Sequence, residues 1–110
     1  MASDQATVDV IVEQASRGNA IRARKMFGEF GIYCDDRFVG IIANDRLYLK
    51  VTDAGDALLP DASRESPYDG AKPHLVVDAE AIEDADRLSA VCRATARALP
   101  PPKPKRSRSS

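Results

Sequence analysis

Residues 21–51 read IRARKMFGEFGIYCDDRFVGIIANDRLYLKV, and this stretch decides the fold. The period of a β-strand, with hydrophobic side chains at alternate positions, appears in segments 21–27, 30–34, 37–43 and 46–51. The pairs Asp35-Asp36 and Asn44-Asp45 separate the later segments, and these residue types tolerate the backbone conformations of tight turns. The stretch therefore predicts four strands joined as an antiparallel meander.

The glycines at positions 28 and 31 stand between basic residues and the acidic pair Asp35-Asp36. A phosphate-binding loop needs amide donors that open onto the N-terminus of a helix, whereas a strand pattern follows here. Isolated glycines in strand patterns mark bulges or turns. Gly28 and Gly31 are therefore predicted to serve the backbone geometry between strands.

Helical periodicity appears on both sides of this stretch. Apolar residues recur at helical spacing over residues 4–16, and again from Asp78 to Leu99, which predicts one long C-terminal helix. Between the meander and that helix we expect a short helical turn ending near Leu59, a surface loop over residues 61–73 and a strand over residues 74–79.

The expected fold class is α+β, because the elements do not alternate as strand, helix and strand. An antiparallel sheet, with a meander of about four strands plus a later strand, is covered by N- and C-terminal helices in two layers. Segment 38–43 is apolar on both faces apart from Gly40, so it is the best candidate for an inner strand. Residues 1–99 form one domain, and the proline-rich basic tail, residues 100–110, is expected to be disordered.

The composition is that of an ordinary globular protein, with 44% hydrophobic and 30% charged residues. No apolar run approaches the length that a membrane-spanning helix needs, which is about 18 residues. The N-terminus lacks the basic start and apolar core of a secretory signal, so a cytoplasmic location is expected. Cys34 and Cys92 are too far apart for a CxxC pair and are predicted to be buried thiols.

No catalytic constellation is visible. His74 is the sole histidine, and no cysteines or acids stand near it at metal-ligand spacing. Cys34 lies inside a predicted strand without an evident activating base. The sequence therefore predicts a protein that is not an enzyme and that uses no metal or cofactor.

Basic residues gather in two places, which are Arg17, Arg22, Arg24 and Lys25 in the body and Lys103, Lys105, Arg106 and Arg108 in the tail. The chain has 16 lysines and arginines, and the four in the tail leave 12 basic against 17 acidic residues elsewhere, a balance of −5. The basic clusters fit phosphate contacts, but the body is acidic and carries no helix-turn-helix or RNP-type motif. The pattern favours weak nonspecific nucleic-acid binding through the tail over sequence-specific DNA binding.

A second pattern is a motif of particular residue types at fixed spacing. Its residues are Arg24, Met26, Phe27, Gly28, Phe30, Gly31, Ile32, Tyr33, Leu47, Tyr48, Leu49, Lys50 and Val51. These residues resemble the signature of the TfoX (Sxy) N-terminal domain family, regulators of competence-specific genes, and the likeness continues more loosely to about Leu99. Glu29 stands where the family pattern has a second glycine. The resemblance implies an antiparallel sheet flanked by helices and a co-regulatory role without enzymatic activity, in which relatives work with a cyclic-AMP receptor protein.

The leading hypothesis is thus a regulatory module that binds a transcription-associated protein partner. The alternative is a nucleic-acid-binding accessory protein that uses Arg22, Arg24, Lys25 and the tail. A homodimer is also open, through an exposed edge strand formed by residues 46–51 or 74–79.

Overall fold

The computed structural model describes residues 4–26 and 29–99 of the 110. These residues form one antiparallel sheet of six strands, with order β1-β2-β3-β4-β6-β5. The strands are β1 (Ile21–Met26), β2 (Glu29–Cys34), β3 (Arg37–Ala43), β4 (Arg46–Leu49), β5 (Arg64–Glu65) and β6 (His74–Val77). The helices are α1 (Gln5–Ala15), α2 (Asp53–Leu58), α3 (Ala79–Glu83) and α4 (Ala85–Ala98).

Two tight turns set the meander, and both fall where the sequence predicts them. Asp35 and Asp36 have φ angles of 51° and 68°, and Asn44 and Asp45 have φ angles of 52° and 60°. Two successive residues with positive φ form the type I′ turn, whose twist matches that of the strands it joins. The antiparallel meander of β1 to β4 is therefore confirmed.

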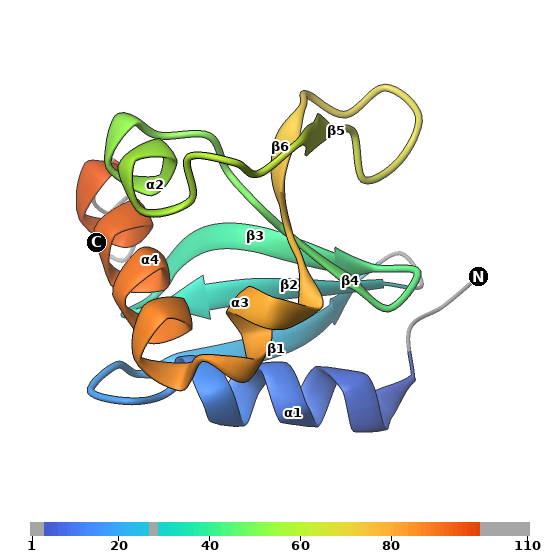
Figure 1. Ribbon diagram of the computed structural model, residues 1–110. Helices are drawn as coiled ribbons and strands as arrows, with labels where there is room; N and C mark the ends of the chain where they lie inside the picture. Colours follow the sequence, from blue (N-terminus) through green and yellow to red (C-terminus); the bar gives the residue numbers. More distant parts are fainter. Residues whose placement is uncertain (1–3, 27–28, 100–110) are drawn as a thin grey trace, which may run out of the picture.

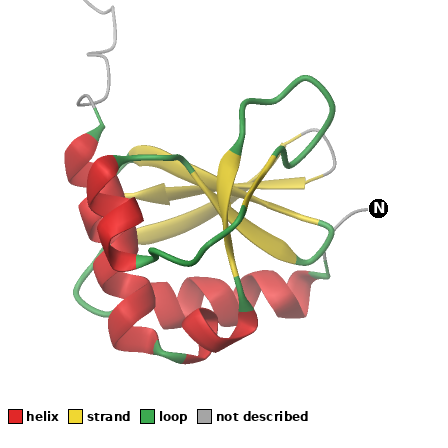
Figure 2. Cartoon of the chain, turned by 45° about the horizontal axis from the view of Figure 1, so that its top comes forward, coloured by secondary structure: helices red, strands yellow, loops and turns green. Residues whose placement is uncertain are grey.

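The helices gather on one side of the sheet, as Figures 1 and 2 show. Helix α1 contacts β1, α4 contacts β2 and β3, and α2 and α3 pack against α4. Among the described residues, no helix packs against the opposite face of the sheet. The predicted α+β architecture in two layers is confirmed. None of the described helices is long and apolar enough to cross a membrane.

The main core lies between the helices and the sheet. Its largest fully buried side chains include Ile11, Ile32, Ile42, Leu47, Leu49, Val39, Leu88 and Val91. They come from α1 and α4 on one side and from β2, β3 and β4 on the other. Burial of this apolar surface is the main source of stability, and it holds the sheet at a fixed angle to the helices.

A bulge interrupts the pairing of β2 with β3. Tyr33 pairs with Phe38, whereas Ile32 pairs with Gly40, so Val39 is the extra residue. Val39 is buried in the main core, and Phe38 lies on the opposite face in a second, smaller cluster. A bulge shifts the alternation of the strand at this point, so it turns Phe38 toward the helix-free face.

The sheet edges differ from the prediction. Both β4 and β6 are inner strands, because β6 pairs with β4 on one side and with β5 on the other. The prediction that residues 46–51 or 74–79 offer an exposed edge is therefore wrong, and the edges are β1 and β5. The short strand β5 lies inside the stretch that we expected to be only a loop. The prediction that residues 38–43 form an inner strand is confirmed.

The expected long C-terminal helix is two helices that meet at Asp84. This residue has an extended backbone conformation, and its carboxylate accepts a hydrogen bond from the backbone N–H of Arg87 at 3.2 Å. Asp78 caps α3 in the same way, through the N–H of Ala81 at 2.9 Å. Each aspartate starts a new helix, because its side chain satisfies an N–H that the first turn leaves free.

Of the two glycines of the family motif, the structure describes only Gly31. Gly31 is buried in the middle of β2 and pairs with Arg24 and Ile41, so it is a strand residue and not a turn. Gly28 lies outside the described residues, as do Phe27 and the tail, residues 100–110, whose expected disorder stays a prediction.

Candidate functional site: the helix-free face of the sheet

We call the face opposite the helices the open face, and alternation along each strand defines its residues. These are Arg22 and Arg24 of β1, Glu29, Gly31 and Tyr33 of β2, Phe38, Ile41 and Ala43 of β3, Arg46 and Tyr48 of β4, Lys50 just after β4, Glu65 of β5, and His74 and Val76 of β6. Cations and aromatic rings thus share one surface. Among the described elements, no helix packs against this set of side chains.

Cations lie over aromatic rings on the open face, in contacts that involve β1, β2, β3 and the residue after β4. The ring centroids of Tyr33 and Phe38 are 5.3 Å apart, with the rings tilted by 44°. The Arg22 guanidinium carbon is 5.3 Å from the Tyr33 centroid, and Lys50 Nζ is 4.8 Å from the Phe38 centroid. Each geometry is that of a cation–π contact, which orients the charged group without neutralising it.

The cations differ in how freely they can meet a partner. Lys50 is half-buried, and desolvation, followed by repulsion from Lys72, lowers its pKa. Arg22 forms an ion pair with Asp36 at 3.1 Å, and both side chains are well exposed, so the pair contributes little stability. Arg24 is exposed, and no ion pair to it occurs within the described residues. The face can therefore attract an acidic group without breaking a strong contact.

The structure divides the predicted site residues between this face and the core. Arg22, Arg24, Gly31, Tyr33, Tyr48 and Lys50 belong to the open face, while Phe30 and Leu47 are buried in the main core. Lys25 pairs with Phe30 on the helix side of the sheet, so it does not join the two arginines. Met26 is the last residue of β1. Phe27, Gly28, Lys103, Lys105, Arg106 and Arg108 lie outside the described residues.

Phe38 and Ile41 belong to the open face but were missed as site residues. Their segment is apolar on both faces, so alternation alone assigns no side to them. The bulge at Val39 also shifts the register between Phe38 and Ile41. The one available signal was the aromatic pair formed by residues 33 and 38 on either side of a predicted two-residue turn, since such positions face each other in a hairpin.

Other chemically active side chains are buried. Cys34 and Cys92 are free thiols in the main core, as predicted. Burial is the main cause that raises the pKa of Cys34 to about 11 and that of Cys92 to about 12, so both stay protonated. His74 is buried, with Nδ1 at 2.7 Å from the carbonyl of Lys72. The described residues hold no group of histidines, cysteines and acids able to bind a metal ion.

These thiols predict a decline in stability at alkaline pH. Their folded pKa values lie above the ordinary 9.0, so the unfolded chain loses these protons first. The contribution of the two protonated thiols to the free energy of unfolding is therefore fully present below pH 9.0. It falls as the pH rises toward 11, by up to about 1.4 kcal/mol per pH unit for each thiol. Urea unfolding at about pH 8 and about pH 10.5 measures the decline. A Cys92→Ala variant should lose less, and an equal loss would contradict the assignment.

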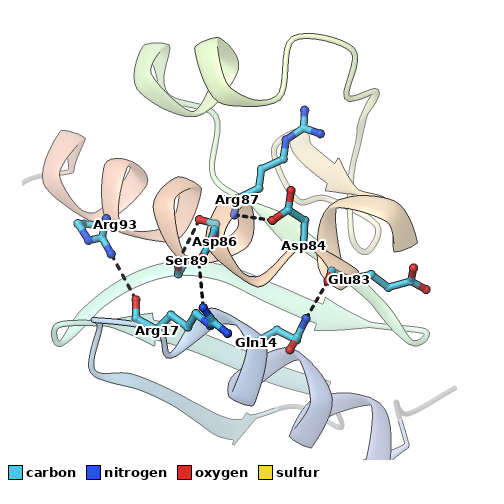
Figure 3. A network of polar contacts seen from close by, with 8 residues as sticks. All are labelled: Gln14, Arg17, Glu83, Asp84, Asp86, Arg87, Ser89 and Arg93. Carbon is cyan, nitrogen blue, oxygen red and sulfur yellow. Dashed lines mark hydrogen bonds and ion pairs between the residues drawn. The ribbon is translucent and has the colours of Figure 1, made fainter.

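An acidic hollow lies near the start of α4, and Figure 3 shows polar contacts of the residues around it. Arg17 pairs with Asp86 at 3.1 Å, and Arg93 donates to the carbonyl of Arg17 at 3.3 Å. Gln14 donates to the carbonyls of Ile82 and Glu83, at 2.9 and 3.2 Å. These contacts join α1 to α3 and α4, so the polar groups of this hollow have a structural use.

Comparison with known proteins agrees with this picture. The family model described as the TfoX N-terminal domain matches residues 13–99, from the second half of α1 to the end of α4. The chain belongs to the TfoX N-terminal domain family. A relative is the "uncharacterized 12.7 kDa protein in trpE 5′ region" of Spirochaeta aurantia, 38% identical over 108 residues. The match covers 98% of this chain and 93% of that protein.

The TfoX signature therefore has two physical parts in this chain. One part, with Phe30 and Leu47, builds the core under the sheet. The other part, with Arg24, Tyr33 and Lys50, lies on the open face, where it contributes little to the main core. Residues of the second kind are the ones available for binding.

Proposed function

We propose that this TfoX N-terminal domain is a non-enzymatic regulatory module that binds an acidic surface of a transcription-associated protein through its open face. The observation that carries the proposal is the meeting of Arg22, Arg24 and Lys50 with Tyr33 and Phe38 on one helix-free surface. Arginine and aromatic residues are enriched where proteins bind one another. The family resemblance supports a role as a cytoplasmic co-regulator linked to competence.

The state of the thiols supports a non-enzymatic role. A nucleophilic cysteine needs a lowered pKa and access to its substrate. Cys34 and Cys92 are fully buried, and their pKa values are raised to about 11 and about 12. They contribute packing, so binding is the better use of the surface that the fold exposes.

Charge reversal on the open face tests the proposal. Tagged wild-type chain and the Lys50→Glu variant are used to capture partners from the extract of the source cells, followed by mass spectrometry. Lys50→Glu removes the cation over Phe38, so capture of a transcription-associated protein should fall by about tenfold or more. Arg97→Glu, an equal charge change on an exposed residue in the last turn of α4, should capture it like the wild type.

Equal capture by Lys50→Glu and the wild type would contradict the use of this face. Recovery of only proteins unrelated to transcription would contradict the regulatory role. Circular dichroism and urea unfolding must show that the two variants remain folded, which the partial exposure of Lys50 allows.

A single-stranded nucleic acid is the second candidate partner, because aromatic rings beside cations on an antiparallel sheet suit unstacked bases and phosphates. The same variants test it with fluorescent single-stranded and duplex DNA over a range of salt concentrations. This candidate requires affinity that falls steeply with salt and is lost in Lys50→Glu. Affinity that is lost only when residues after Leu99 are removed would assign the binding to the tail instead.

A further inference from the structure

Strand β1 is an edge of the sheet, and its outer backbone groups can be identified. Asp35 donates its backbone N–H to the carbonyl of Ala20 at 2.9 Å, which makes these two residues a hydrogen-bonded pair. Such pairs alternate along an antiparallel ladder, so Arg22 and Arg24 also bond to β2. The N–H and C=O groups of the residues between them therefore point away from the sheet, and these residues are Ile21, Ala23 and Lys25.

No other described segment uses this outer row of backbone groups. An unpaired row of N–H and C=O groups is a template for one more strand. Strand β1, which carries this row, is six residues long, a usual length for a strand. The other edge, β5, has only two residues. Strand β1 is thus the edge of this sheet that can accept an extended segment.

A groove runs along the helix side of this edge. It is lined by β1 from Ile21 to Arg24 and by α1, through the apolar Val8 and Val12 and the polar Gln5, Asp9 and Glu13. Ile21 and Ala23 are half-buried and pack against the main core. Apolar side chains of an added strand would enter this groove beside them. Every second residue of that strand should therefore be apolar.

The other side of the same edge is positively charged. Arg22 and Arg24 lie on the open face, and an added strand would place its remaining side chains directly beside them. Within the part of the chain that the structure describes, Arg22 is held by the weak, exposed pair with Asp36 and by the Tyr33 ring, which leaves its charge in place. Acidic residues are the ones that this side favours.

A second copy of β1 is a poor occupant, because the register forbids good charge pairing. The outward-pointing backbone groups of β1 belong to odd-numbered residues. When the β1 strands of two copies pair antiparallel, odd-numbered residues therefore lie opposite odd-numbered ones, and even-numbered residues opposite even-numbered ones. The central register places Arg22 of each copy opposite Arg24 of the other, and a shift by one pair places Arg22 opposite Arg22 or Arg24 opposite Arg24. Like charges directly opposite each other destabilise a strand pair.

We infer that β1 binds an extended segment of a partner protein in which acidic and apolar residues alternate, as a seventh strand of the six-stranded sheet. The inference rests on the proposed function in that the occupant is a protein. Its acidic residues lie beside Arg22 and Arg24, and its apolar residues enter the groove between α1 and β1.

A synthetic peptide tests this directly with the purified chain. The probe is a fluorescent peptide of alternating aspartate and valine, and fluorescence anisotropy measures its dissociation constant. Arg24→Glu should weaken binding by about tenfold, because it replaces an attraction with a repulsion across the strand pair. Arg97→Glu is the matched control and should bind like the wild type. A peptide of alternating lysine and valine should bind at least about tenfold more weakly than the probe.

The backbone contact has its own test at Lys25, whose N–H points away from β2. Lys25→Pro removes that N–H, while Lys25→Ala removes only the charge. Because proline is tolerated on an edge strand when its position faces solvent, both variants should fold, which thermal unfolding checks. Lys25→Pro should bind the aspartate-valine peptide about fivefold more weakly than Lys25→Ala. Equal affinities of these two variants would overturn strand addition at β1.

The outcomes separate this inference from the proposed function. If the aspartate-valine and lysine-valine peptides bind equally, or neither binds, the inference fails even where Lys50→Glu still abolishes partner capture. Peptide binding that depends on Arg24 and Lys25 supports the inference even if Lys50→Glu captures the partner normally. A dimer in sedimentation experiments that Lys25→Pro dissociates would overturn the inference in favour of a second copy.

Discussion

Gly40→Ala is expected to lower the free energy of unfolding by more than about 3 kcal/mol, a large share of the roughly 5 to 15 kcal/mol of an ordinary domain. A Cβ atom at Gly40 would lie 2.2 Å from the carbonyl oxygen of Tyr48 and 3.1 Å from the Cα atom of Leu49. Both are backbone atoms of the paired strand β4, so a side-chain rotation cannot relieve the contact. Strands β3 and β4 must separate at Gly40, and urea unfolding measures the cost.

Gly70→Ala is the matched control for this substitution. Gly70 has a φ angle of +87°, and a Cβ atom there would meet nothing within 4 Å. It should cost only the strain of a positive φ, which is about 1 to 2 kcal/mol. A Gly40→Ala variant that loses no more stability than Gly70→Ala would show that β3 and β4 can separate easily. The bulge would then not hold Phe38 in a fixed position on the open face.

Leu88→Ala is expected to lower the free energy of unfolding by about 2 to 5 kcal/mol. Leu88 is on α4, is 0% exposed and belongs to the main core between the helices and the sheet. Its truncation removes apolar contacts and leaves a cavity that the surrounding elements fill only in part. Urea or thermal unfolding measures the loss.

Val10→Ala provides the comparison for the core substitution. Val10 is on α1 and is 52% exposed, so its truncation should change the free energy of unfolding by less than about 0.5 kcal/mol. Similar losses for the two variants would contradict the placement of α4 against the sheet. The peptide-binding edge should survive Val10→Ala, because this side chain does not line the groove beside β1.

Part of the candidate site could be predicted from sequence, because the alternation of residues within one strand assigns their faces. Arg22 and Arg24 alternate with Ile21 and Ala23 over a regular strand, so their shared face follows from the period of two. Phe38 could not be assigned in this way, because its segment is apolar on both sides and the bulge at Val39 reverses the alternation. A bulge depends on how two strands match across their hydrogen bonds, which neither strand encodes alone.

Local sequence features alone predict the turns and strands of the meander. Aspartate and asparagine pairs set the turns at Asp35-Asp36 and Asn44-Asp45, and the alternating residues around them set the strands of the meander. The TfoX resemblance is also strongest in this stretch, from Arg24 to Val51. These features need no knowledge of which distant segments touch.

Only the tertiary structure decided which strands lie at the edges of the sheet. Strand β6 inserts between β4 and β5, so the segments that looked like free edges are inner strands, and β1 remains exposed. Pairing of β4 with β6 joins residues such as Tyr48 and Val76, far apart in the chain, so it depends on burying a shared core and not on local sequence. The open face and the edge of β1 are consequences of that long-range pairing.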